Sequence, residues 1–111
     1  MKEYPKTMSE EMLPVIDLKA KMPEGGWNIV AGASTYAMFL DESDNTMIRV
    51  FFDLDSINKS YNIIKYATSQ KVSFELTAES GLVLSFDGIV TNLGRNHATF
   101  RVKRKDITDL F

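Results

Sequence analysis

The sequence predicts a single α+β domain, mainly an antiparallel curled sheet or small barrel of about six strands. One amphipathic helix near residues 56–68 and a short C-terminal helical turn complete this expected fold. Three observations lead to the prediction. Most runs after residue 26 alternate apolar and polar residues with a period of two, which is typical of half-buried strands. Short polar or glycine-containing segments separate these runs, and the period becomes helical in only one long segment.

Residues 1–25 differ in character from the rest of the chain. Pro5, Pro14 and Pro23 interrupt this segment, and each proline removes a backbone donor and disfavours helix in the residue before it. We therefore predict an N-terminal arm over residues 1–25, either loosely ordered or ordered by a partner, followed by a single β-rich domain over residues 26–111. Within the arm, residues 15–18 could form a short edge strand.

The first half of the β-rich domain contains three predicted strands. They cover residues 27–31, 35–40 and 46–54, with a turn at residues 32–34 and a polar loop at residues 41–45. In the third strand, alternation places two sets of side chains on opposite faces. One set is Ile48, Val50, Phe52 and Leu54, and the other is Met47, Arg49, Phe51 and Asp53.

A helix is expected over residues 56–68. Asp55 or Ser56 can accept hydrogen bonds from the free N–H groups of its first turn. Apolar or small residues then recur at helical spacing, which indicates one buried stripe. The stripe consists of Ile57, Tyr61, Ile64 and Thr68, widened by Ile63, Tyr66 and Ala67.

Three further strands are expected over residues 71–77, 82–92 and 97–103, joined by turns. Gly88 interrupts the longest of them, and an isolated glycine in a strand often marks a bulge or sharp bend. Such a bend would allow one strand to serve two faces of a curled sheet. Asp106 can cap the final helical turn, which would carry Ile107, Leu110 and Phe111.

The overall charge and composition exclude several classes of protein. The net charge is −2 and there is no cysteine, so neither a disulfide framework nor a cysteine metal site can form. General attraction to anionic membranes or nucleic acid is disfavoured. The sequence contains no apolar run of the roughly 18–20 residues that span a bilayer, and the N-terminal residues do not resemble a signal peptide. We therefore expect a cytoplasmic protein without a membrane partner.

Charge is distributed unevenly along the chain. Residues 1–56 contain five basic and ten acidic residues, a net charge of −5, whereas residues 57–111 contain eight basic and five acidic residues, a net charge of +3. Residues 95–105 contain five basic residues and no acidic residue. The last long strand should therefore present a basic outward face that includes His97, Thr99, Arg101 and Lys103.

The primary functional hypothesis is a small non-enzymatic binding or regulatory module that recognises a protein partner through a basic strand and an apolar patch. The expected contact residues are Arg95, His97, Arg101, Lys103, Arg104, Lys105, Met47, Arg49 and Phe51. A nucleic-acid-binding small β-barrel is the alternative, if Tyr61, Tyr66 or Trp27 lies beside the basic strand. The sequence does not determine the oligomeric state, and a homo-oligomer is compatible with it.

No catalytic residue, metal ligand or cofactor is predicted. The segment Phe51 to Ser56 reads Phe-Phe-Asp-Leu-Asp-Ser and resembles the first motif of haloacid-dehalogenase-type phosphotransferases. In that family the first aspartate attacks phosphorus and the second acts as acid/base with Mg²⁺. A small metal phosphohydrolase that uses Asp53 and Asp55 is therefore a second alternative. The loop at residues 41–45 concentrates carboxylates, but it lacks the spacing of an EF-hand calcium site.

The stretch from Lys71 to Phe111 resembles other small barrels in its strand pattern. The strand, the long strand bent at Gly88, the third strand and the terminal turn together look like a small SH3-like or Sm-like barrel. They are equally similar to the last three strands of a PilZ-type cyclic-di-nucleotide domain, although residues 1–25 lack the arginine-rich motif of that family. Both resemblances imply a barrel; neither rests on a specific motif, and no family is assigned from them.

Overall fold

The computed structural model describes residues 12–23, 25–53, 56–103 and 108–109. Within them it contains one helix and eight strands. These are β1 (Leu13–Lys21), β2 (Trp27–Ile29), β3 (Ala33–Leu40), β4 (Thr46–Phe52), α1 (Ser56–Tyr66), β5 (Val72–Ala78), β6 (Val83–Leu93), β7 (His97–Val102) and β8 (Thr108–Asp109). No described helix is long and apolar enough to cross a membrane.

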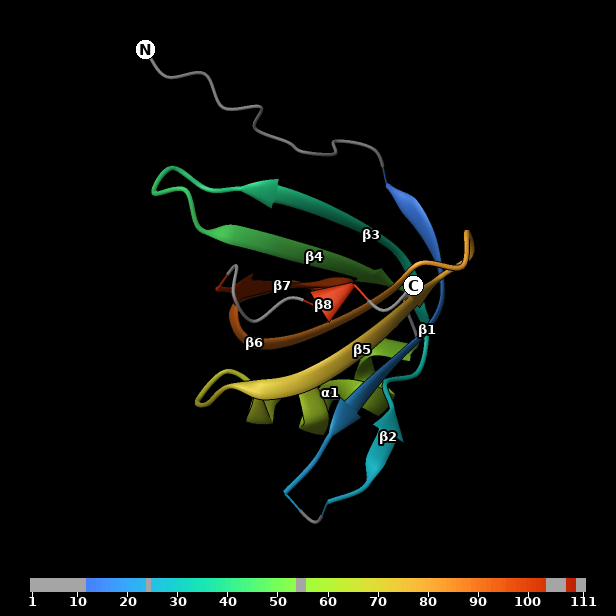
Figure 1. The fold of residues 1–111 in the computed structure, drawn as a ribbon. Coiled ribbons are helices and arrows are strands. Elements are labelled where there is room, and N and C mark those ends of the chain that lie inside the picture. The colour runs from blue at the N-terminus through green and yellow to red at the C-terminus, as the bar shows by residue number, and fades with distance from the viewer. Residues whose placement is uncertain (1–11, 24, 54–55, 104–107, 110–111) are drawn as a thin grey trace.

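Six of the strands close into an antiparallel barrel, which confirms the predicted fold class (Figure 1). The strands follow the order β1-β3-β4-β7-β6-β5, and β5 returns to pair with β1. Hairpins form β3–β4, β5–β6 and β6–β7. The pairs β4–β7 and β1–β5 join segments distant in sequence, and β2 adds to β1 outside the closed barrel. Closure leaves the six barrel strands with paired neighbours on both sides.

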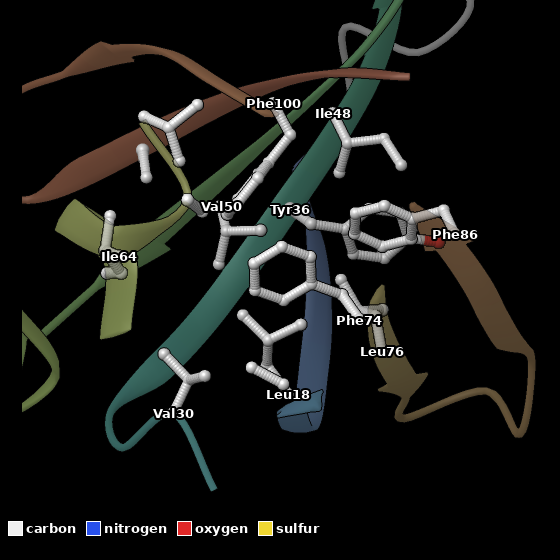
Figure 2. Packing of buried hydrophobic residues seen from close by; sticks show 14 of the residues in the cluster. Leu18, Val30, Tyr36, Ile48, Val50, Ile64, Phe74, Leu76, Phe86 and Phe100 are labelled. Atoms are coloured by element: carbon white, nitrogen blue, oxygen red, sulfur yellow. The ribbon is translucent and has the colours of Figure 1, made fainter. Parts of the chain in front are cut away.

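The interior of the barrel is filled by the alternate apolar residues that the sequence predicts (Figure 2). Phe74, Phe86 and Phe100 lie against one another, with ring centroids 4.7 to 5.9 Å apart. Such ring pairs contribute beyond the area that they bury. On β4, the residues predicted to face inward are indeed buried: Ile48, Val50 and Phe52. The period-two pattern of β4 therefore identified its inner face correctly.

Helix α1 connects β4 to β5 and, with the residue after it, packs on the barrel core through part of the predicted stripe. Ile64 and Ala67 are fully buried, and the amide of Val90 on β6 donates a hydrogen bond to the carbonyl of Ala67 at 2.9 Å. Tyr61, which the predicted stripe included, is 43% exposed. The helix ends at Tyr66, before the predicted end at Thr68. Ile63 and Tyr66, which the prediction also included, are partly buried against the core, so the stripe is confirmed at these four positions and wrong at Tyr61.

Gly88 on β6 lies where that strand changes neighbours. It is the register partner of both Val72 on β5 and Val102 on β7. A Cβ atom at Gly88 would lie 3.3 Å from the Phe86 ring and from the Phe100 Cβ. Gly88 thus permits close packing inside the barrel, and the actual register shift occurs two residues later, between Val90 and Asn92.

Both ends of the described chain differ from expectation. The predicted arm includes β1, whose Leu18 and Ala20 are completely buried in the barrel, so the boundary at residue 25 does not separate an arm from the barrel. Residues 13–21 form a strand because the backbone N–H and C=O groups of β1 pair with those of β5 along most of its length. At the C-terminal end, Thr108–Asp109 forms a strand that pairs with β6 rather than part of a helical turn. Residues 1–11, 104–107 and 110–111 lie outside the described residues.

Candidate binding site: a basic hollow on the outer face

The outer surface of β6 and β7 contains a hollow of about 160 Å³. Its lining residues, which we call the basic hollow, are Lys71, Asp87, Ile89, Arg101 and Lys103. Sites for whole small molecules usually measure about 300–1,000 Å³. The basic hollow is smaller than that range but large enough for several water molecules. Its size therefore suits a single carboxylate or phosphate group and not a whole nucleotide.

Strand register places these side chains together. Gly88, Val72 and Val102 form one row whose members are all buried. Because side chains alternate across a strand, the residues immediately before and after each member of this row face outward. Ile89 and Arg101 are themselves register partners on β6 and β7. Of these six outward residues, all except Ser73 line the basic hollow.

The basic hollow has an excess of positive charge. Lys71, Arg101 and Lys103 supply three positive charges and Asp87 supplies one negative charge, so the formal charge is +2. The Ser73 hydroxyl donates a 2.6 Å hydrogen bond to Asp87 Oδ1 and fixes that carboxylate on the β5 side. Lys71, Arg101 and Lys103 are exposed. An anion entering from solvent therefore meets cationic side chains from more than one strand.

Arg49 lies on the same outer surface, on β4, but its side chain is engaged within the protein. Its Nε donates a 3.0 Å hydrogen bond to the Thr99 hydroxyl on β7. Its guanidinium carbon lies 4.9 Å from the centroid of the Phe39 ring, within the range of a cation–π interaction. Thr99, predicted to face outward, is only 2% exposed. The outward face of β4 and β7 is thus partly covered by its own side chains.

His97 lies at the start of β7, beside Phe51 of β4. The two ring centroids are 5.8 Å apart, and His97 Nε2 lies 3.3 Å from the side-chain oxygen of Asn92. The ring also lies against the backbone of Gly94, where a Cβ atom would collide with it. Burial lowers the pKa of His97 below its ordinary value, and the positive charge of Arg49 adds to this effect. His97 therefore favours its neutral form.

The predicted apolar patch is not an exposed surface. Met47 is only 7% exposed, and Phe51 is half-buried beside His97. Met47 lies between Phe39 of β3 and Arg101 of β7 in the strand register, so side chains flank it on both sides. The apolar residue that lines the basic hollow is instead Ile89.

The predicted basic residues do not all lie in one place. Arg101 and Lys103 line the basic hollow. Arg95 is exposed in the turn between β6 and β7, at the opposite end of β7 from Lys103. Arg104 and Lys105 lie outside the described residues. The structure therefore brings two of these five basic residues into a defined site.

The acidic loop at residues 41–45 borders the basic end of β7. Asp41 Oδ1 accepts hydrogen bonds from the amides of Ser43 and Asn45, and its Oδ2 accepts one from the Asn45 side chain. The bonds from Asn45 are the main cause that lowers the Asp41 pKa below its ordinary value, with a smaller contribution from the Arg101 charge. These hydrogen bonds within the loop hold the Asp41 carboxylate in place, and its negative charge lies near Arg101.

The carboxylates of the phosphotransferase-like motif are only partly described. Asp53 follows β4 and is exposed, and its amide donates a hydrogen bond to the Gly32 carbonyl. Asp55 lies outside the described residues. Within the described part of the chain, no group of three or more histidine or acidic residues is arranged to hold a metal ion.

Three residues that line the basic hollow were not predicted from the sequence: Lys71, Asp87 and Ile89. Lys71 lies just before β5, and the other two flank Gly88 on β6. Pairing the predicted strands as hairpins, with Gly88 opposite both Val72 and Val102, would have placed them beside Arg101 and Lys103.

Comparison of the chain with family models, curated proteins and solved structures found no match.

Proposed function

We propose that the protein is a small binding module that recognises an acidic segment of a protein partner at the basic hollow. The observation that carries the proposal is the convergence of Lys71, Arg101 and Lys103 around a hollow that suits one anionic group. Ile89 adds an apolar contact for the same segment. Exposed cations from more than one strand can bind carboxylates through charge-assisted hydrogen bonds, which are stronger than neutral ones.

The geometry supports nucleic acid less well as the ligand. A long polyanion that follows β7 past Lys103 would approach the loop that contains Asp41, Glu42 and Asp44. Like-charge repulsion there opposes an extended phosphate backbone. Trp27 lies on β2, which β1, β5 and β6 separate from β7, and Tyr61 is on α1. Trp27 therefore does not flank the basic strand as base stacking would require.

Fluorescence anisotropy with a labelled hexaglutamate peptide tests the proposal. Wild-type protein should bind at low ionic strength, and added salt should weaken binding because the contacts are exposed charges. Replacing Arg101 and Lys103 together by glutamine should reduce affinity about tenfold or more, which corresponds to about 1.4 kcal/mol or more. Lys65→Gln is the matched control, because Lys65 is an exposed cation on α1.

Two results would reject this proposal. One is the absence of hexaglutamate binding at low salt. The other is equal binding by wild type and by the Arg101→Gln/Lys103→Gln variant. A labelled oligothymidylate of similar charge serves as a comparison ligand, and tighter binding of this oligonucleotide than of hexaglutamate would favour the nucleic-acid alternative.

A further inference from the structure

We infer that the preferred ligand of the basic hollow is a phosphorylated side chain, a phosphate monoester dianion within the acidic segment. This inference rests on the proposed function and identifies the chemical group that the hollow binds. It follows from the charge of the hollow and from the arrangement of its donors, both of which favour a phosphate dianion over a carboxylate.

The charge of the basic hollow matches a dianion. Its three positive charges and the Asp87 carboxylate leave a formal charge of +2. A phosphate monoester carries about −1.5 to −2 at neutral pH, whereas a carboxylate carries −1. Counted over these lining residues alone, a single carboxylate would leave one positive charge unbalanced, whereas a phosphate monoester would compensate almost all of the charge.

The arrangement of donors also favours phosphate. Arg101 lies on β7, Lys103 directly follows that strand and Lys71 directly precedes β5, with β6 between the two strands. Donors thus approach the hollow from two sides, which suits the three acceptor oxygens of a phosphate better than the two of a carboxylate. An arginine among them can bind two phosphate oxygens at once.

Asp87 places one fixed negative charge beside the cations of the hollow. The Ser73 hydroxyl donates to Asp87 Oδ1 at 2.6 Å, so the carboxylate remains on the β5 side of the hollow. A ligand anion must overcome repulsion from this charge through its attraction to the cations. Attraction to the cations and repulsion from Asp87 both scale with the charge of the ligand, so Asp87 weakens the binding of monoanions and dianions alike and the preference for a dianion comes from the net charge of +2.

Isothermal titration calorimetry with three peptides of one sequence tests this inference on the full chain. The central residue between two glutamate pairs is phosphoserine, sulfoserine or glutamate. The phosphoserine peptide should bind at least about fivefold more tightly than either monoanion at neutral pH. Its advantage should fall as pH decreases from 7 to 5, because the second phosphate pKa is about 6, whereas sulfoserine keeps its charge.

Single substitutions in the basic hollow test which side chains cause the preference for phosphoserine. Lys103→Gln should remove most of the preference for phosphoserine over glutamate. Asp87→Asn should tighten binding of all three peptides, and most of all that of the phosphoserine peptide, because the repulsion that it removes scales with the charge of the ligand. Lys65→Gln is the control whose affinities should not change. Circular dichroism verifies that each variant remains folded.

The outcomes distinguish this inference from the proposed function. Equal binding of the phosphoserine and glutamate peptides would overturn the phosphate inference and leave the acidic-segment proposal standing. Failure of all three peptides to bind at low salt would overturn both. Binding of inorganic phosphate as tight as that of the phosphoserine peptide would show that the flanking segment contributes nothing and would overturn the assignment to a protein segment.

Discussion

The Arg49 Nε on β4 donates a hydrogen bond to the hydroxyl of Thr99, its register partner on β7, at 3.0 Å. This bond joins two strands that are distant in sequence. The Thr99 side chain that accepts it is almost completely buried. It also keeps the Arg49 guanidinium over Phe39 and away from the basic hollow. Arg49 therefore has a structural role on the same surface on which Arg101 and Lys103 are proposed to bind a ligand.

Loss of this cross-strand bond should lower stability. Arg49→Ala should reduce the free energy of unfolding by about 1–2 kcal/mol, because both the hydrogen bond and the cation–π contact are removed. Thr99→Val should cost about 1 kcal/mol. Urea unfolding of both single variants and of the double variant measures the coupling energy between Arg49 and Thr99. Arg95→Ala, in the exposed turn, is the control, and strictly additive effects would contradict a direct Arg49–Thr99 interaction.

The close packing at Gly88 predicts a second effect on stability. Gly88→Ala places a methyl group 3.3 Å from Phe86 and Phe100, so the core must shift, at a cost of about 1–3 kcal/mol. Gly26→Ala is the matched control, because no atom lies within 4 Å of the added methyl group. Thermal unfolding should show a clear decrease in Tm for Gly88→Ala alone. Equal Tm values for the two variants would contradict the packing described at Gly88.

His97 predicts a dependence of stability on pH. Its pKa in the folded protein lies below the ordinary value of 6.5, so the unfolded chain binds a proton more readily. The stability that neutral His97 contributes is fully present above pH 6.5 and is lost as pH falls toward the folded-state pKa. Urea unfolding between pH 8 and 5 should show this decrease for wild type and a smaller one for His97→Gln. Identical pH profiles would refute the role of His97.

The hydrogen bonds of Asp41 predict a stability change at lower pH. Its folded-state pKa lies below 3.8, so its contribution is present above that value and is lost as pH falls through the folded-state pKa. Asp41→Ala should cost about 1 kcal/mol at neutral pH, because the amides of Ser43 and Asn45 lose their acceptor. The difference between variant and wild type should shrink in urea unfolding at pH 2. A constant difference would show that the charge of Asp41 is irrelevant.

Much of the fold follows from local sequence patterns. Alternation in β4 identifies Ile48, Val50 and Phe52 as core residues, and β5 follows the same rule. On β7 the predicted core residues are buried too, but so is Thr99 on the opposite face. Alternation specifies which face a side chain occupies but not which strand lies beside it. The β1–β5 pair that closes the barrel was not predicted for this reason, and residues 13–21 were assigned to an arm.

The candidate site was less predictable than the fold. The basic residues of β7 were recognisable from charge alone, and two of them line the basic hollow. The sequence did not reveal that Met47 is flanked by Phe39 and Arg101, or that Lys71 and Asp87 reach the same hollow. Both depend on register between strands, which local patterns do not determine.

Backbone amide NMR during titration with the hexaglutamate peptide tests the central claim most directly, because it locates the binding surface. The account predicts that the largest chemical-shift changes occur at Lys71, at residues 87–89 and at residues 101–103, with little change in β2 or α1. Changes concentrated at Trp27–Ile29 or on α1, with residues 101–103 unaffected, would contradict it.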